Sequence, residues 1–355
     1  MEMKSKVVVV TEPGKLDIIE REIPQLQPED MLVKIDMSGV CGTDIHEVYH
    51  PQPYSGSQRS YPAFLGHEPV GTIVEMGDKA PKTDSDGTPI KVGDRIIYVG
   101  IGRTTRRHIP SIGGAFAEYA YVGGDFTIYK VPPSIPMETA VLAEPFENGL
   151  RGLGRAFQPG LPYSLNCMGP GKIVVIQGSG CIGIMTVAAA KLCGAYKIIV
   201  IGAPENRLEM CRKFGADLTI NFMETTEEER AEMIKSLTPR GVGPDIVMEI
   251  AGAPEAFREA LNLVCRGGTV VEVGHFTYRG TIEINPEILI RKDMQIFGHG
   301  GFSLSDFRNA LRLFEAYGDQ FPFHQVVTDK FPLEQTMDAI NLSREEGCVK
   351  AVIVP

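Results

Sequence analysis

The chain has 355 residues, of which 43% are hydrophobic and 23% charged, and its formal net charge is −10. This length and composition favour about two globular domains of roughly 100–200 residues each. The acidic charge argues against nucleic acid or an anionic membrane as a partner, because both require a basic surface, and there is no apolar run of about 18 residues to span a membrane.

The first 150 residues carry the pattern of an all-β domain. The apolar run at 7–10 is short and is followed at once by charges, so it predicts a first strand and not a signal peptide. Gly, Pro and Asp separate further strand-like runs at 31–40, 70–77, 91–100 and 116–122. Two stretches rich in Pro or polar residues, 51–62 and 84–89, predict loops.

The pattern changes near Gly169 to alternating strands and helices. The predicted strands occupy 172–178, 197–202, 245–252 and 268–274, and the predicted helices occupy 182–194, 207–215, 225–237 and 255–264. This alternation is typical of an α/β domain with a Rossmann-type parallel sheet. A last helix at 305–318 and a strand at 350–355 follow. We therefore predict a β-rich domain at 1–150, completed by 299–355, and an α/β domain at 151–298.

A glycine motif lies between the first predicted strand and helix of the α/β domain. Gly178, Gly180 and Gly183 form a G-x-G-x-x-G sequence, with Cys181 and Ile182 inside it. In this context the first glycine allows a tight turn, the second lets the backbone approach a pyrophosphate, and the third allows close packing of helix against strand. The amide groups at the start of the helix favour the phosphate charge. The motif predicts a dinucleotide cofactor.

The end of the second strand bears on the choice between NAD and NADP. Gly202 stands where an acidic residue usually binds the adenosine ribose, which removes one barrier to a 2′-phosphate. No Ser-Arg pair follows, and Glu205 repels a phosphate. Arg207 is a candidate phosphate ligand or simply a solvated residue. We predict NAD, with NADP as the alternative.

Two segments of the β-rich part supply metal-ligating residue types. Cys41 opens the sequence C-G-T-D-I-H, which ends at His46, and His67 and Glu68 follow Gly66. Thiolate, imidazole and carboxylate are the ligands of a zinc site, and a catalytic site uses three of them and leaves one position open. A dinucleotide domain in the same chain indicates hydride transfer.

With these motifs, in this order and spacing, the whole chain resembles the zinc-containing medium-chain dehydrogenases, which pair a GroES-like catalytic domain with a Rossmann domain. The resemblance implies that Cys41 and His67 bind the catalytic zinc. It implies that Glu68 is a ligand or moves in and out of the coordination shell. Thr43 and His46 match the family's proton relay.

The same resemblance bears on the surroundings of the zinc. Asp44 matches the carboxylate that orients the zinc-bound imidazole. The Glu-Pro at Glu144 is similar to the sorbitol and threonine dehydrogenase branch, in which the glutamate binds zinc directly or through water. Glu147 is a weaker candidate, and the competing interpretation is that Glu144 only caps the following helix.

The cysteines limit the metal count. There are seven, without a Cys-x-x-Cys motif, which favours reduced thiols and a cytoplasmic protein. No cysteine lies between Cys41 and Cys167, so the four-cysteine structural zinc of many relatives is excluded, and we expect one zinc per chain.

The predicted function is oxidation of a secondary alcohol or polyol by a homodimer or homotetramer. Three nearby arginines suggest an alternative, an anionic alcohol such as a phosphorylated, phosphonylated or sulfonated one, as the substrate: Arg103, Arg106 and Arg107. A zinc-free relative of the quinone reductase kind and a non-enzymatic binding protein are further alternatives, and both are disfavoured by Cys41 together with His67. Four aromatic residues are either pocket-lining or packing groups: Tyr54, Tyr61, Phe116 and Phe276.

Overall fold

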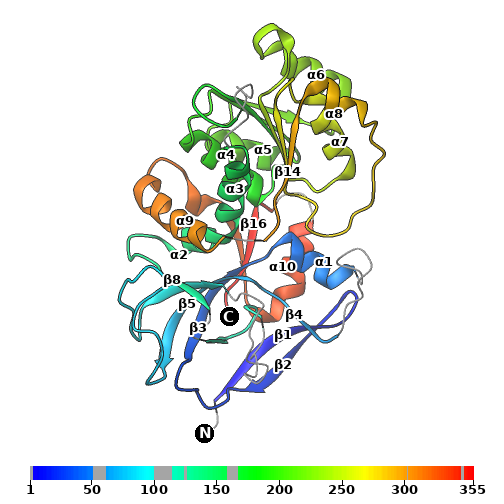
Figure 1. The fold of residues 1–355 in the computed structure, drawn as a ribbon. Coiled ribbons are helices and arrows are strands. Elements are labelled where there is room, and N and C mark those ends of the chain that lie inside the picture. Colours follow the sequence, from blue (N-terminus) through cyan, green and yellow to red (C-terminus); the bar gives the residue numbers. More distant parts are fainter. Residues whose placement is uncertain are drawn as a thin grey trace. The chain divides into compact units, whose positions relative to one another are not determined.

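The structure is a computed structural model, and it describes residues 3–50, 61–99, 114–123, 126–157, 167–301, 303–344 and 348–355 (Figure 1). The chain divides into two compact units. The first comprises Met1–Glu144 and Phe307–Pro355, and the second comprises Pro145–Asp306. The boundaries between the units therefore follow residues 144 and 306, whereas the sequence analysis predicted them after residues 150 and 298.

The first unit contains two sheets. In the smaller sheet β1 (Lys4–Glu12) pairs with β2 (Lys15–Glu22) and with β4 (Ala63–Phe64). The larger sheet has the order β15-β16-β3-β5-β6-β8, with β7 also paired to β3. Its strands are β3 (Met31–Gly39), β5 (Glu68–Met76), β6 (Arg95–Val99), β7 (Tyr119–Val122), β8 (Thr127–Lys130), β15 (Val327–Phe331) and β16 (Lys350–Ile353). The C-terminal strand β16 runs antiparallel to β3, so the end of the chain completes the N-terminal sheet.

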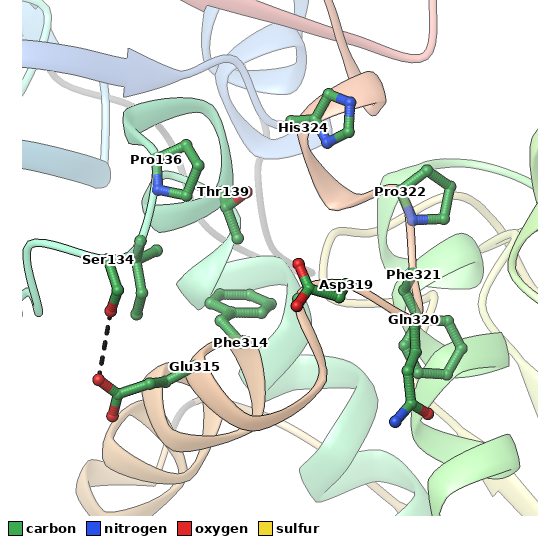
Figure 2. Close-up of a pocket in the computed structure, with 12 residues that line it drawn as sticks. Ser134, Pro136, Thr139, Phe314, Glu315, Asp319, Gln320, Phe321, Pro322 and His324 are labelled. Carbon is green, nitrogen blue, oxygen red and sulfur yellow. Dashed lines mark hydrogen bonds between the residues drawn. The ribbon is translucent and has the colours of Figure 1, made fainter.

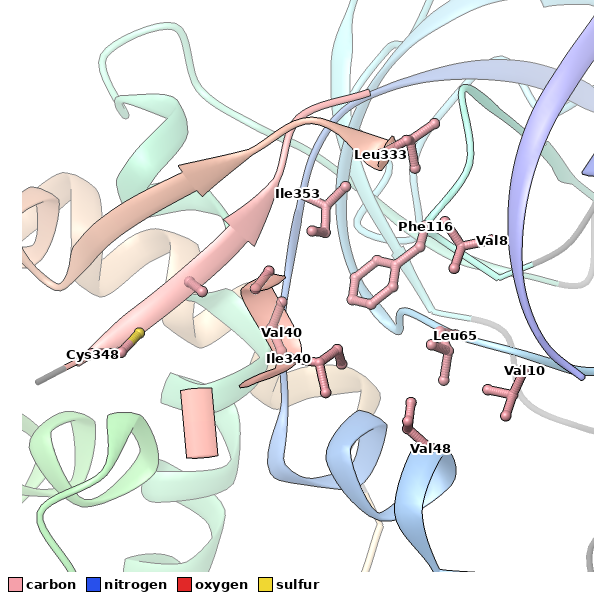
Figure 3. Close-up of a cluster of buried hydrophobic side chains, with 12 residues drawn as sticks. Val8, Val10, Val40, Val48, Leu65, Phe116, Leu333, Ile340, Cys348 and Ile353 are labelled. Atoms are coloured by element: carbon pink, nitrogen blue, oxygen red, sulfur yellow. The ribbon is translucent and has the colours of Figure 1, made fainter. Parts of the chain in front are cut away.

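In the described residues, the α-helices that accompany these sheets are α1 (Gly42–Tyr49), α2 (Met137–Ala140), most of α9 (Leu304–Tyr317) and α10 (Thr336–Arg344). A hydrophobic cluster joins α1 and α10 to the sheet, and Figure 3 shows its side chains converging. Val40 and Leu65 belong to this cluster and lie just before Cys41 and Gly66-His67 in the chain. Burial of these apolar neighbours therefore fixes the two segments in which the sequence predicts metal ligands.

The second unit has a six-stranded parallel sheet in the order β11-β10-β9-β12-β13-β14. Its strands are β9 (Ile173–Gln177), β10 (Lys197–Gly202), β11 (Leu218–Asn221), β12 (Ile246–Glu249), β13 (Thr269–Glu272) and β14 (Gln295–Gly298). This is the strand order of a dinucleotide-binding fold, in which the ligand crevice opens where the order reverses, between β9 and β12. The Rossmann-type sheet and the separate β-rich part confirm the predicted fold class.

Helices cover both faces of this sheet (Figure 1). One face packs against α6 (Glu227–Ser236), α7 (Pro254–Leu263) and α8 (Glu287–Lys292) through Ile234, Leu261, Ile288 and their neighbours. The remaining helices are α3 (Ala143–Arg155), α4 (Cys181–Leu192) and α5 (Glu205–Lys213). Thr226 precedes α6 and forms a capping box with Glu229, which satisfies backbone amides at the start of that helix.

Several short or weakly patterned elements were not predicted, among them β11, α1 and α3. Strand β11 is short and only partly buried, so it lacks the continuous apolar run of the central strands. Helix α1 lies within the metal motif and has few apolar residues, and α3 is interrupted by glycines and a proline. Their local sequence signals are weak, and tertiary packing stabilises them.

Candidate active site

Cys41, His67 and Glu68 come together in the first unit. Cys41 is the residue before α1, His67 follows the turn at Gly66, and Glu68 begins β5. Their ligand atoms all lie within 4.8 Å of one another. Gly66 has a φ of +86°, and a Cβ there would lie 2.7 Å from the Phe116 ring. The turn that presents His67 therefore requires glycine.

Asp44 connects the two segments. Its buried carboxylate accepts hydrogen bonds of 2.9 Å from the backbone amides of Cys41 and Gly66, and it lies 3.6 Å from Nδ1 of His67. Desolvation opposes the charged imidazolium, yet the charges of Asp44 and Cys41 raise the pKa of His67 well above its ordinary value. Likewise burial works to raise the pKa of Asp44, but His67 and the two amides lower it on balance. The site thus concentrates negative charge around one imidazole.

Glu68 has a partner that the sequence analysis missed. The Lys350 ammonium of β16 lies 2.5 Å from Oε2 of Glu68 and also donates to the carbonyl of Val40, at 2.9 Å. Both side chains are buried. A Cβ on Gly39 would lie 1.9 Å from the Glu68 carboxylate, so glycine at this position makes room for the pair. The available signal was a lysine at the start of the apolar strand K-A-V-I.

Glu144 lies beside this cluster but outside the group of three. A cavity of about 10 Å³ is lined by Glu144, His67 and Glu68, among others, and it has the size of about one water molecule. Glu144 is in the first turn of α3, where a carboxylate also favours the helix dipole. Glu147 is wholly buried and accepts a 2.6 Å hydrogen bond from the backbone amide of Ser303, which gives it a structural role.

Thr43 and His46 lie on α1, next to the ligand segment. Thr43 Oγ1 lies 3.8 Å from the Cys41 sulfur. His46 lies one helical turn further along, with its ring centroid 5.0 Å from that of the exposed His50. The two predicted relay residues therefore run along one helix from the cluster to an exposed histidine.

The glycine motif adopts the geometry expected of a dinucleotide site. Gly178 has a φ of +118° at the end of β9, and a Cβ on Gly183 would lie 2.0 Å from the Gly178 carbonyl oxygen. Gly180 caps the N-terminus of α4, whose first residues are Cys181 and Ile182, and it faces open space. The turn thus has both the close packing and the open backbone that such a motif needs.

The end of β10 explains the missing acidic residue. A Cβ on Gly202 would lie 2.4 Å from the Ser179 hydroxyl, which itself donates to the carbonyl of Ala203. The side chain of an aspartate or glutamate at position 202 would therefore clash with Ser179. Arg207 lies in α5, which begins at Glu205, so both residues stay close to this edge of the sheet.

The aromatic candidates divide between core and surface. Phe116 is fully buried in the cluster of Figure 3, and Tyr61 packs against that cluster, so both are packing residues. Phe276 is 48% exposed, and Tyr54 lies outside the described residues. Arg103, Arg106 and Arg107 also lie outside them.

A larger cavity in the first unit contains none of the predicted site residues. It measures about 560 Å³, and Figure 2 shows Thr139, Phe314, Asp319 and His324 around it. The side-chain hydrogen bond drawn there runs from the Ser134 hydroxyl to the Glu315 carboxylate, at 3.2 Å. Its lining lacks the thiolate and imidazole pair of the candidate site.

Two family descriptions match the chain, "alcohol dehydrogenase GroES-like domain" over residues 27–133 and "zinc-binding dehydrogenase" over residues 181–316. The L-threonine 3-dehydrogenase of Pyrococcus horikoshii is 33% identical over 85% of this chain and 84% of its own. The sorbitol dehydrogenase of Bacillus subtilis is 31% identical over 99% and 97%. The chain belongs to the zinc-binding dehydrogenases. As a zinc-binding dehydrogenase it is an NAD(P)-linked oxidoreductase, which confirms the predicted enzyme class and cofactors.

The fold also matches a zinc-binding dehydrogenase of Sinorhizobium meliloti bound to NADP, with a TM-score of 0.81, 25% identity and complete coverage of both chains. These similarities do not favour the zinc-free or the non-enzymatic alternative, nor an anionic alcohol as substrate. In the part of the chain that the structure describes, no helix is long and apolar enough to cross a membrane.

Proposed function

We propose that the protein oxidises a secondary alcohol or polyol, with zinc held by Cys41, His67 and a carboxylate. The observation that carries this proposal is the convergence of a thiolate, an imidazole and a carboxylate within 4.8 Å. This donor set fits zinc, and Asp44 orients the His67 ring for metal binding. Zinc, when bound, supplies Lewis acidity that lowers the pKa of an alcohol.

The choice of carboxylate follows from the charges around it. Glu68 already has Lys350 beside it, which offsets its charge and holds it in place. Glu144 lines the adjoining cavity. We therefore propose Glu144 as the third ligand, directly or through water, with Glu68 able to approach the metal only by leaving Lys350. A hard carboxylate ligand suits substrates that offer two oxygens, so vicinal diols should react faster than ethanol.

The chain's own residues then move the proton of the substrate. Thr43, beside the Cys41 sulfur, accepts this proton as its hydroxyl gives up its own, and the His46 imidazole takes the released proton on towards solvent. The His46→Ala enzyme should keep its zinc and lose rate most at low pH, where proton removal is hardest. An unchanged pH–rate profile would count against this relay.

For the cofactor we propose binding of the pyrophosphate at the Gly180 end of α4, with NAD preferred over NADP. Glu205 supports this preference because its charge opposes a 2′-phosphate, whereas Gly202 and Arg207 leave NADP possible. The ratio of kcat/KM with NAD to that with NADP tests the preference. A ratio below one would reverse it.

The deciding experiment combines metal analysis with a panel of alcohols, diols and polyols. Cys41→Ala and His67→Ala should each lower kcat/KM by more than about 1000-fold, because Lewis acidity supplies several kcal/mol. Cofactor binding should persist, because the glycine motif lies in the other unit.

Two matched variants control for loss of any thiol or imidazole. Cys193→Ala removes a half-buried thiol in α4's C-terminal turn, and His324→Ala removes a ring from the larger cavity. Both should keep one zinc per chain and near-normal activity. Near-normal activity of Cys41→Ala or His67→Ala without zinc would refute the proposed function. We further propose a homodimer or homotetramer in the cytoplasm, which light scattering and fractionation test.

A further inference from the structure

A second cluster of potential ligands lies in the other unit. Glu249 is the last residue of β12 and Glu272 the last of β13, and the two are paired in register on adjacent parallel strands. His275 follows three residues later. The strands therefore bring both carboxylates, and then the imidazole, to the carboxyl edge of the sheet.

The distances match those between neighbouring ligands on one metal ion. Nδ1 of His275 lies 3.4 Å from Oε2 of Glu249 and is hydrogen-bonded to Oε1 of Glu272 at 3.0 Å, and one potential ligand atom from each of the three residues lies within 4.8 Å of the others. Ligands at about 2.1 Å from a metal are about 3.0 Å apart in octahedral geometry and about 3.4 Å apart in tetrahedral geometry. The cluster therefore needs little rearrangement to bind an ion.

Each carboxylate is anchored by one oxygen and has the other available. Oε1 of Glu249 accepts from the Gly252 amide at 2.8 Å, and Oε1 of Glu272 accepts from the His275 amide at 3.0 Å. Both Oε2 atoms are buried, and neither accepts a hydrogen bond from a described residue. The Glu249 side chain is completely buried. Each carboxylate is thus held in place through its Oε1 and keeps a buried Oε2 for a cation.

The carboxylates of this cluster form no ion pair with a lysine or arginine of the described residues. Among those residues their ionic partner is His275, which carries a positive charge only when it is protonated. Burial and the neighbouring Glu272 raise the pKa of Glu249 to about 8. Two adjacent carboxylates in a buried place need a proton or a cation between them.

We propose that Glu249, Glu272 and His275 bind a divalent transition-metal cation at a site separate from the catalytic zinc. One nitrogen and two carboxylate oxygens suit Mn²⁺, Co²⁺ or Zn²⁺ better than Mg²⁺ or Ca²⁺, which prefer oxygen alone. Having no thiolate, this site should bind its metal more weakly and exchange it during dialysis, whereas the catalytic zinc remains.

The test is a Mn²⁺ titration of the zinc-loaded, dialysed enzyme, followed by electron paramagnetic resonance. One bound Mn²⁺ per chain is expected. Glu272→Gln and His275→Gln should each weaken Mn²⁺ binding by at least about tenfold, and catalytic zinc content should not change. Glu228→Gln, an exposed carboxylate in α6 of the same unit, is the matched control and should bind Mn²⁺ normally.

A stability measurement guards against misfolded variants. Mn²⁺ should raise the melting temperature of the parent enzyme by mass action and have no effect on Glu249→Gln. Glu249→Gln is nearly isosteric and removes a repulsion, so it should melt no lower than the metal-free parent. Absence of bound Mn²⁺, or Mn²⁺ affinity unaltered by Glu272→Gln and His275→Gln, would overturn the proposal and leave a pair of carboxyl groups that share a proton.

Discussion

At the candidate site of the first unit, buried ionisable groups lie beside groups of opposite charge. Glu68 is 2.5 Å from the Lys350 ammonium, and Asp44 is 3.6 Å from the His67 ring and accepts two backbone amides. Each charge is offset within the unit itself. The pKa of Asp44 is lowered and that of His67 is raised, so both favour their charged forms.

At two places in the second unit, groups of like charge are brought together. Glu249 pairs in register with Glu272, and buried His299 lies near Arg151 and Arg155. Burial and those two arginines lower the pKa of His299 to about 4, so its ring is neutral at pH 7. The comparison teaches that the groups of the first unit's site are stable when ionised. In the second unit, His299 must lose its proton, and the Glu249–Glu272 pair must gain a proton or bind a cation.

The largest effect is expected when one partner of a buried opposite-charge pair is removed. Lys350→Met leaves the Glu68 carboxylate buried without its cation and should lower the free energy of unfolding by about 3–5 kcal/mol. Denaturant titration of the metal-free protein measures this. The double variant Glu68→Gln/Lys350→Met should recover most of the loss.

The exposed pair Lys4–Glu20 provides the matched control for Lys350. Its side chains are 56% and 61% exposed, so Lys4→Met should change stability by less than about 1 kcal/mol. Equal effects of the two lysine substitutions would show that burial does not strengthen the Glu68–Lys350 pair.

A smaller effect tests which further carboxylate serves the first unit's cluster. Glu144→Ala should lower zinc affinity or kcat/KM by roughly tenfold or more, because it weakens the metal's surroundings. Glu147→Gln should do much less, since Glu147 is engaged with the Ser303 amide. An unaffected Glu144→Ala enzyme, together with a zinc-bound structure in which Glu144 is remote, would assign Glu144 to capping α3.

A further effect, on the second unit, concerns His299 and pH. Its folded pKa of about 4 lies below the ordinary 6.5, so the unfolded chain binds more protons between these values. Stability from the neutral ring is therefore complete above pH 6.5 and declines as the pH falls towards 4. Between pH 7 and 5 the loss should be roughly 1–2 kcal/mol.

A matched substitution isolates the His299 contribution. His299→Asn should flatten this part of the stability–pH curve, and substitution of the exposed His50 should leave it unchanged. If the curve of His299→Asn keeps the slope of the parent, another group is responsible for the acid sensitivity.

Local patterns in the sequence predicted much of the fold. The apolar runs of β9 and β10 and the G-x-G-x-x-G turn at Gly178 are formed by neighbouring residues, so their geometry follows from local backbone rules. The residue types of Cys41 and His67 indicated metal ligands, and the resemblance to the zinc-containing dehydrogenases implied that they share one site. Short or weakly amphipathic elements such as β11 and α1 gave no comparable signal.

Tertiary structure alone decided the partners that are far apart in the sequence. Lys350 reaches Glu68 because β16 pairs with β3, and Glu249 meets Glu272 because β12 and β13 are in register. Phe116 proved to be core and not pocket, since burial depends on what packs around it. Composition and periodicity predict local secondary structure, because they depend only on residues that are neighbours along the chain. The electrostatic energy of a buried charge depends on atoms brought near it only by folding.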